Sequence, residues 1–144
     1  MSRNYYSEIN LHLVWHTKNS LPLLDGQVGV AAYRALRNRI IETPGAFIHE
    51  IGGIATHVHL AVSVPPTLTP SEWIGKLKGG SAHDVNSQFA TLAKVLQWQT
   101  GYGIVSFGSK DLQWVIAYVQ NQEQHHARGS SVDRLEKLDQ DERP

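Results

Sequence analysis

Alternating apolar and polar residues predict four β-strands. Residues 5–16, YYSEINLHLVWH, alternate and end in β-forming side chains. Two apolar runs, 46–54 and 58–64, are separated by only a few residues, which favours a β-hairpin. GYGIVSFG, residues 101–108, predicts the fourth strand.

Three segments with helical spacing lie between and after these strands. The first covers residues 28–42, and TPG ends it. The second begins at the capping box TPSE, with proline at the first helical position, and continues to Phe89. The third covers residues 110–126. The order β-α-β-β-α-β-α predicts an α+β fold, a ferredoxin-like (RRM-like) antiparallel sheet with packed helices.

Composition limits the class of protein. The 144 residues include 41% hydrophobic residues and no cysteine, so disulfides and thiolate metal sites are excluded. We expect one catalytic domain over residues 1–130 and a charged C-terminal tail over 131–144. No apolar run is long enough for a membrane span and no signal peptide is evident, so we expect a cytoplasmic protein.

The net charge of zero gives little support to duplex binding. Without residues 131–144 the chain has 10 basic and 8 acidic residues, which is not a basic patch. A nucleic-acid function must therefore depend on a specific site.

The pair His57-Val58-His59 stands at the start of an apolar run. Residues i and i+2 of a strand point to the same face, so the two imidazoles project together. A divalent cation could bind both neutral rings. The alternative is two ordinary histidines that are solvated or hydrogen-bonded, and a metal site needs a third ligand.

The last helix offers candidates for that third ligand and for a nucleophile. Tyr118 and Gln122 are four residues apart, one above the other, at the border of the apolar stripe. A phenol and an amide oxygen placed there could meet the histidine pair. The alternative is a half-buried tyrosine beside a solvated glutamine.

Four blocks together resemble a known family: HLVWHTKNSLP, THVHLAVSVPPTLTPSEWIGKLKGGS, LQWQTGYGIVSFG and VIAYVQNQEQHH. They resemble the HUH single-tyrosine transposases, which include the small transposases of hairpin-ended bacterial insertion sequences and the REP-associated tyrosine transposases. The resemblance covers about residues 9–128. It implies that His57, His59 and Gln122 bind Mg or Mn and that Tyr118 is the nucleophile. It also implies a homodimer that acts on single-stranded DNA with hairpins.

Three departures from the family pattern affect this expectation, and one of them is a short and acidic C-terminal tail. Thr56 stands where the family commonly has aspartate, which removes an expected hydrogen-bond partner for an imidazole or the metal. Asp84 adds an acid to a helix that is more basic in relatives, so DNA binding could be weaker.

Candidate DNA contacts lie elsewhere in the chain. Lys76 and Lys78 could bind phosphates, and Trp98 and Tyr102 could stack on bases. The alternatives are a solvated helix face for the lysines and core positions for the aromatic residues.

We therefore expect a metal-dependent transposase that cleaves single-stranded DNA through a 5′-phosphotyrosine intermediate and rejoins it. One alternative is a catalytically inactive ferredoxin-like module that binds single-stranded DNA or RNA. Another is a small metal-binding protein with different chemistry.

Overall fold

The structure is a computed structural model that describes residues 4–89, 91 and 93–138. Its strands are β1 (Asn10–His16), β2 (Phe47–Ile54), β3 (His57–Ser63) and β4 (Gly103–Phe107). They form one antiparallel sheet in the order β2-β3-β1-β4, with β3 and β1 in the centre. The predicted ferredoxin-like α+β fold is confirmed by this arrangement and by the solved structures described below.

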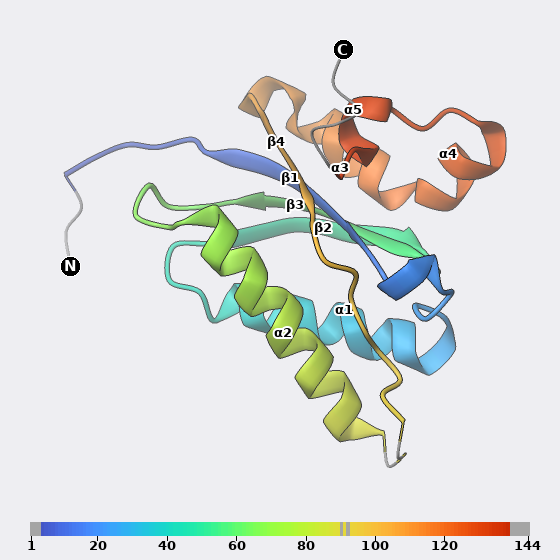
Figure 1. Cartoon of the computed structure of the whole chain (residues 1–144). Helices are drawn as coiled ribbons and strands as arrows, with labels where there is room; N and C mark the ends of the chain where they lie inside the picture. The colour runs from blue at the N-terminus through green and yellow to red at the C-terminus, as the bar shows by residue number, and fades with distance from the viewer. Residues whose placement is uncertain (1–3, 90, 92, 139–144) are drawn as a thin grey trace.

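Helices cover both faces of the sheet, which gives three layers (Figure 1). The helices α1 (Gly26–Ile41) and α2 (Pro70–Gln88) cover one face. The other face carries α3 (Leu112–Gln120), α4 (Gln122–Arg128) and α5 (Asp133–Glu136). Short 3-10 helices, η1 (Lys18–Ser20) and η2 (Ser109–Asp111), complete the list. Among the described residues, no helix combines the length and apolar character needed to cross a bilayer.

Alternation along the central strands separates the core from the polar face. The residues that face α1 and α2 are apolar and form the main core, including Leu11, Leu13, Trp15, Val58, Leu60 and Val62. The intervening residues include His12, His57 and His59, which face α3 and are almost fully buried. The same sheet therefore supplies a hydrophobic core on one face and a cluster of imidazoles on the other.

The first strand is shorter than predicted. Alternation suggested residues 5–16, whereas β1 begins at Asn10. Asn10 pairs with Ser63 at the end of β3 and with Phe107 at the end of β4. Before Asn10, the carbonyl of Ile9 still accepts a hydrogen bond of 3.0 Å from the N–H of Val64, just past β3. The predicted hairpin is confirmed as β2 and β3.

The last predicted helix, 110–126, is broken at Asn121 into α3 and α4. Side-chain amides at the break compete for backbone carbonyls. Asn121 donates to the carbonyl of Ala117 at 2.8 Å, and Gln122 donates through Nε2 to the carbonyl of Tyr118 at 2.9 Å. Helical spacing alone does not show such a break, at which Asn121 leaves the helical conformation with φ −106° and ψ 30°.

The second long helix begins at Pro70, as predicted, but without the expected side-chain cap. Thr69 precedes the helix in an extended conformation and its hydroxyl forms no capping hydrogen bond.

Candidate active site

Two adjacent strands place four imidazoles on one face of the sheet. His57 and His59 of β3 are 3% and 0% exposed. On β1, His16 is directly paired with His57, and Val14 is paired with His59. His12, two residues before Val14, projects to the same face. The histidine pair predicted from the sequence therefore belongs to a larger group.

The neighbours of the pair orient its rings. Thr56 Oγ1 is hydrogen-bonded to His57 Nδ1 at 3.0 Å. His12 Nε2 is hydrogen-bonded to His59 Nδ1 at 2.8 Å, and the His16 ring stacks on His57 with centroids 4.7 Å apart. Because each Nδ1 is engaged, the Nε2 atoms of both rings are left to face the centre of the site.

The hydroxyl of Thr56 corrects one expectation. The absence of aspartate at this position was expected to leave an imidazole or metal without a partner. The threonine side chain instead supplies an oxygen to His57 Nδ1.

The phenol of Tyr118 reaches this cluster from α3. Tyr118 is 2% exposed, and its ring centroid lies 6.0 Å from that of His59. The ring stacks against Trp114 on one side and His125 on the other, with centroids 5.5 and 4.8 Å away. The hydroxyl donates to Glu136 Oε2 and accepts a hydrogen bond of 2.8 Å from the backbone N–H of Val132.

Close packing of α3 on the sheet makes this approach possible. A Cβ atom added to Gly52 of β2 would lie 2.1 Å from the carbonyl oxygen of Val119. Glycine at this position therefore lets the helix backbone contact the strand, and Val115 and Val119 pack beside Ala61.

Gln122 lies beside the phenol, one turn further on. Gln122 is 1% exposed, and its Nε2 donates a hydrogen bond to the backbone carbonyl of Tyr118. Its Oε1 forms no hydrogen bond with the described residues. The structure thus brings Tyr118 to His59 of the predicted pair, and Gln122 contacts Tyr118.

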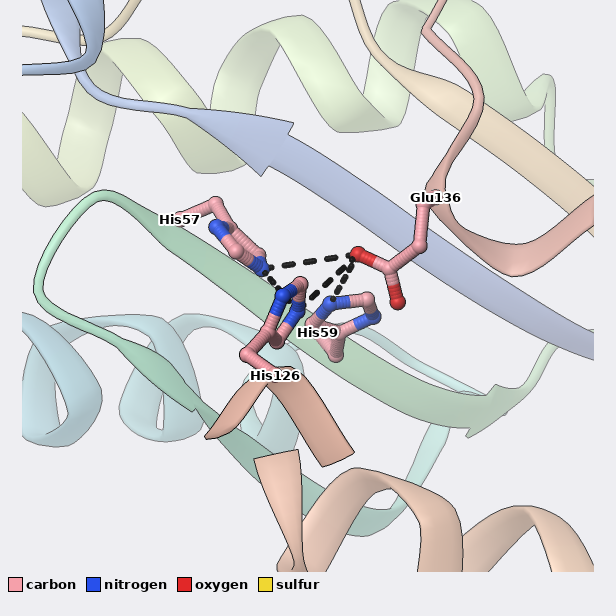
Figure 2. Close-up of side chains that lie close together, drawn as sticks. All are labelled: His57, His59, His126 and Glu136. Carbon is pink, nitrogen blue, oxygen red and sulfur yellow. Dashed lines mark hydrogen bonds and ion pairs between the residues drawn. The ribbon is translucent and has the colours of Figure 1, made fainter. Parts of the chain in front are cut away.

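A segment near the C-terminus contributes two groups that the sequence analysis did not select. The chain reverses at Gly129, whose φ is 66°, and α5 then packs through Leu135, which is 4% exposed. Glu136 Oε1 lies 3.2 Å from His59 Nε2, and His126 of α4 also reaches this oxygen. Figure 2 shows one oxygen of this carboxylate joined by dashed lines to three imidazoles. Glycine followed by Val132 and Leu135 was the available signal for a turn and a short packed helix.

Burial and mutual contacts shift the pKa values of these groups. Burial and the hydrogen bond to Glu136 raise the pKa of Tyr118 to about 12. Burial alone would raise the pKa of Glu136, but hydrogen bonds with His57 and His59 lower it overall. Burial, together with neighbouring imidazoles, lowers the pKa of His12 to about 3. The phenol is therefore protonated and the carboxylate ionised at neutral pH.

The donor set fits a divalent cation. Single ligand atoms from His57, His59, His126 and Glu136 all lie within 4.8 Å of one another. The unbonded Oε1 of Gln122, next to Tyr118, is a further buried oxygen. Imidazole nitrogens and carboxylate or amide oxygens are ordinary ligands of divalent metals.

The candidate DNA contacts lie away from this site. Lys78, Trp98 and Tyr102 line a groove of about 1230 Å³ beside α2. Lys78 Nζ donates to the carbonyls of Gln99 and Gly101 at 2.6 and 2.7 Å, so its ammonium holds one wall together. Trp98 Nε1 donates to a serine of α2, whereas the Lys76 side chain is exposed.

Asp84 of α2 forms a salt bridge with a residue of the neighbouring helix α1. Arg39 of α1 forms two hydrogen bonds with its carboxylate at 2.8 and 2.9 Å. The guanidinium lies over Gly80, where a Cβ would approach it to 2.3 Å. The acid that was expected to weaken DNA binding is thus neutralised within the protein.

Comparison with known families decides the family. The sequence profile of the family described as "Transposase IS200 like" matches residues 5–122. The chain belongs to the IS200-like transposase family. The predicted membership among the HUH single-tyrosine transposases is confirmed.

Individual relatives of this IS200-like transposase agree with its fold. The ISDra2 transposase TnpA of Deinococcus radiodurans is 25% identical over 124 residues, which cover 83% of this chain and 88% of the relative. A crystal structure of a D. radiodurans R1 protein assigned as a transposase matches with a TM-score of 0.67 and 24% identity, covering 85% of this chain and 96% of that one. A REP-associated tyrosine transposase bound to a REP hairpin matches with a TM-score of 0.61 and 16% identity, covering 91% and 75%.

Proposed function

We propose that this IS200-like transposase cleaves and rejoins single-stranded DNA at hairpins through a 5′-phosphotyrosine at Tyr118. One observation carries the proposal: a single carboxylate, that of Glu136, contacts the Tyr118 hydroxyl with one oxygen and the Nε2 atoms of His57 and His59 with the other. The nucleophile and the metal-binding groups therefore converge on one small anion. A DNA phosphate placed there would meet both.

We assign His57, His59 and Gln122 as the ligands of a divalent cation, Mg or Mn, during strand transfer. When bound, such a cation neutralises the charge of the phosphate and stabilises the charge that develops on it. Thr56 and His12 orient the two imidazoles through their Nδ1 atoms. All three ligands are neutral, so the site keeps its positive charge toward the DNA.

The reaction at Tyr118 is a displacement at phosphorus. The Tyr118 oxygen forms a bond to phosphorus, the bond from phosphorus to the 3′ oxygen breaks, and the phenolic proton leaves. The upstream strand ends in a 3′-OH, and attack by a 3′-OH on the phosphotyrosine reverses the step. Trp114 and His125 hold the phenol between them, which fixes the direction of attack.

DNA binding is proposed for the groove beside α2. Lys76, Lys78, Trp98 and Tyr102 remain our proposed contacts, with Lys76 exposed for a phosphate and Tyr102 half-buried at the wall. The hairpin held by the REP-associated relative supports a hairpin substrate. A homodimer and a cytoplasmic location are further parts of this proposal.

A gel assay tests the proposal. Labelled single-stranded DNA from either side of the gene is incubated with the protein and Mn²⁺ or Mg²⁺, and covalent adducts are separated under denaturing conditions. We expect an adduct with the natural protein and with the control variant Tyr6→Phe, whose side chain is exposed, and none with Tyr118→Phe. DNA binding without an adduct would instead identify a binding module.

A further inference from the structure

One carboxylate oxygen of Glu136 contacts three imidazoles of the histidine cluster. Its Oε1 is 3.5, 3.2 and 3.4 Å from the Nε2 atoms of His57, His59 and His126. Figure 2 shows these contacts meeting at one oxygen. His57 Nε2 and His126 Nε2 are themselves 3.1 Å apart. Three ring nitrogens and one carboxylate oxygen thus form a compact group.

Most of the printed distances within this group are those of ligands around one ion. Zinc binds imidazole nitrogen and carboxylate oxygen at about 2.0–2.2 Å in tetrahedral sites, which puts neighbouring ligand atoms roughly 3.3–3.6 Å apart. Four of the six separations, at 3.1–3.5 Å, lie close to that range, and all the ligand atoms lie within 4.8 Å of one another. Ring nitrogens this close, with little exposure to solvent, are also poorly satisfied by one another, since neutral imidazoles offer one donor each.

We infer that His57, His59, His126 and Glu136 form a four-ligand site for a Zn²⁺-class ion in the resting protein. This inference rests on the proposed function only in taking His57 and His59 as metal ligands. His126 and Glu136 replace Gln122 and the DNA phosphate as the remaining ligands. Three imidazoles and one carboxylate suit zinc far better than magnesium, which prefers oxygen ligands and bound water.

The consequence for catalysis is a closed site. Four protein ligands complete a tetrahedral shell, so no position is left for a phosphate oxygen. The same carboxylate accepts the hydrogen bond of the Tyr118 hydroxyl through Oε2. Glu136, and with it α5, must therefore move away before DNA can reach the tyrosine.

Cobalt substitution tests the ligand set without DNA. The full-length metal-free protein is titrated with Co²⁺, which absorbs visible light strongly in tetrahedral sites and weakly in octahedral ones, and Zn²⁺ is then added as competitor. We expect a tetrahedral spectrum that Zn²⁺ removes. In Glu136→Gln and His126→Ala, we expect Zn²⁺ affinity to fall by about 10- to 100-fold or more, since even groups that only support ligands have effects of that size.

Matched controls keep the test specific. Glu123→Gln and His83→Ala alter exposed side chains of the same types on α4 and α2, and should leave the spectrum and affinity unchanged. Because His126 and Glu136 lie on different elements, one variant remains informative if the other does not fold, as checked by circular dichroism. Zn²⁺ should also slow hydrogen exchange in residues 130–138 of the natural protein.

Unchanged affinity in both variants, or an octahedral spectrum, would overturn the inference. The two proposals fail separately. A DNA adduct at Tyr118 with no tetrahedral site would contradict the four-ligand zinc site and leave the proposed strand transfer intact. A tetrahedral site that depends on Glu136, with no DNA adduct in Mn²⁺, would contradict the proposed strand transfer and leave the zinc site intact.

Discussion

Single hydrogen bonds to imidazole Nδ1 atoms decide how the candidate metal ligands are presented. Thr56 is hydrogen-bonded to His57 Nδ1, and His12 is hydrogen-bonded to His59 Nδ1. These partners fix which nitrogen of each ring is available and in which direction it points. The resemblance led us to expect aspartate in place of Thr56, and a hydroxyl is the weaker, neutral substitute.

Removing the hydroxyl of Thr56 should therefore weaken metal binding. In Thr56→Val, His57 Nδ1 loses its partner, and we expect the affinity for Mn²⁺ or Zn²⁺ to fall by about 10-fold. Thr56→Ser keeps the hydroxyl and should bind nearly as well as the natural protein. Isothermal titration calorimetry checks both variants, and equal affinity in Val and Ser variants would contradict the role assigned to the hydroxyl.

Buried imidazoles also make stability depend on pH. The pKa of His12 is about 3 in the folded protein, against a usual 6.5 when unfolded. Between these values the unfolded chain binds a proton that the folded chain does not, so the free energy of unfolding falls as the pH falls from 6.5 toward 3. At pH 4.5, this one group should cost about 2 kcal/mol relative to pH 7.

Urea unfolding of the metal-free protein at pH 7 and pH 4.5 measures this effect. The variant His12→Phe keeps a planar ring but has no titrating group. Its loss of stability between the two pH values should be smaller than that of the natural protein by about 2 kcal/mol. The same loss in both proteins would show that His12 does not carry the dependence.

The position of α3 on the sheet is set by one glycine. The contact between Gly52 and the carbonyl of Val119 leaves no room for a Cβ atom. Gly52→Ala should force α3 away from β2, destabilise the protein by about 1–3 kcal/mol and reduce adduct formation by Tyr118. Gly79→Ala, on α2 with no atom within 4 Å, should instead stabilise by about 0.5–1 kcal/mol.

Chemical denaturation and the adduct assay, run on both alanine variants, check this prediction. If Gly52→Ala is as stable and as active as Gly79→Ala, the close packing of α3 on β2 does not position the tyrosine.

Periodicity predicted the elements and half of the site for identifiable reasons. The two-residue period of a strand places His57 and His59 together, and the helical period places Gln122 one turn after Tyr118. Both relations are local, so the sequence contains them. The break at Asn121 depends on side-chain hydrogen bonds that helical periodicity does not report.

The remaining part of the site depends on contacts between distant segments. Glu136 reaches His59 because the chain turns at Gly129 and because the neighbouring Leu135 is buried, which anchors α5. His126 joins the cluster from α4, which follows the break at Asn121. In the sequence, Glu136 is one of several acids in a charged segment, and nothing local separates it from the others. Residues 139–144 of that segment lie outside the described residues.

At the scale of the whole molecule, the two faces of the sheet have different roles. The core between the sheet and α1 and α2 supports the strands, and the opposite face carries the chemistry beneath α3, α4 and α5 (Figure 1). The tyrosine and the histidine pair of one chain are already adjacent. Within the proposed dimer, each chain could therefore cleave DNA with its own tyrosine.

Mass spectrometry of the DNA reaction tests the central claim most directly. After incubation with hairpin-containing single-stranded DNA and Mn²⁺, the protein should gain the mass of the downstream fragment with its 5′-phosphate. Trypsin should place that gain on the peptide DLQWVIAYVQNQEQHHAR, in which Tyr118 is the one tyrosine. Cleaved DNA with no mass gain, or a gain on another tyrosine, would contradict the account.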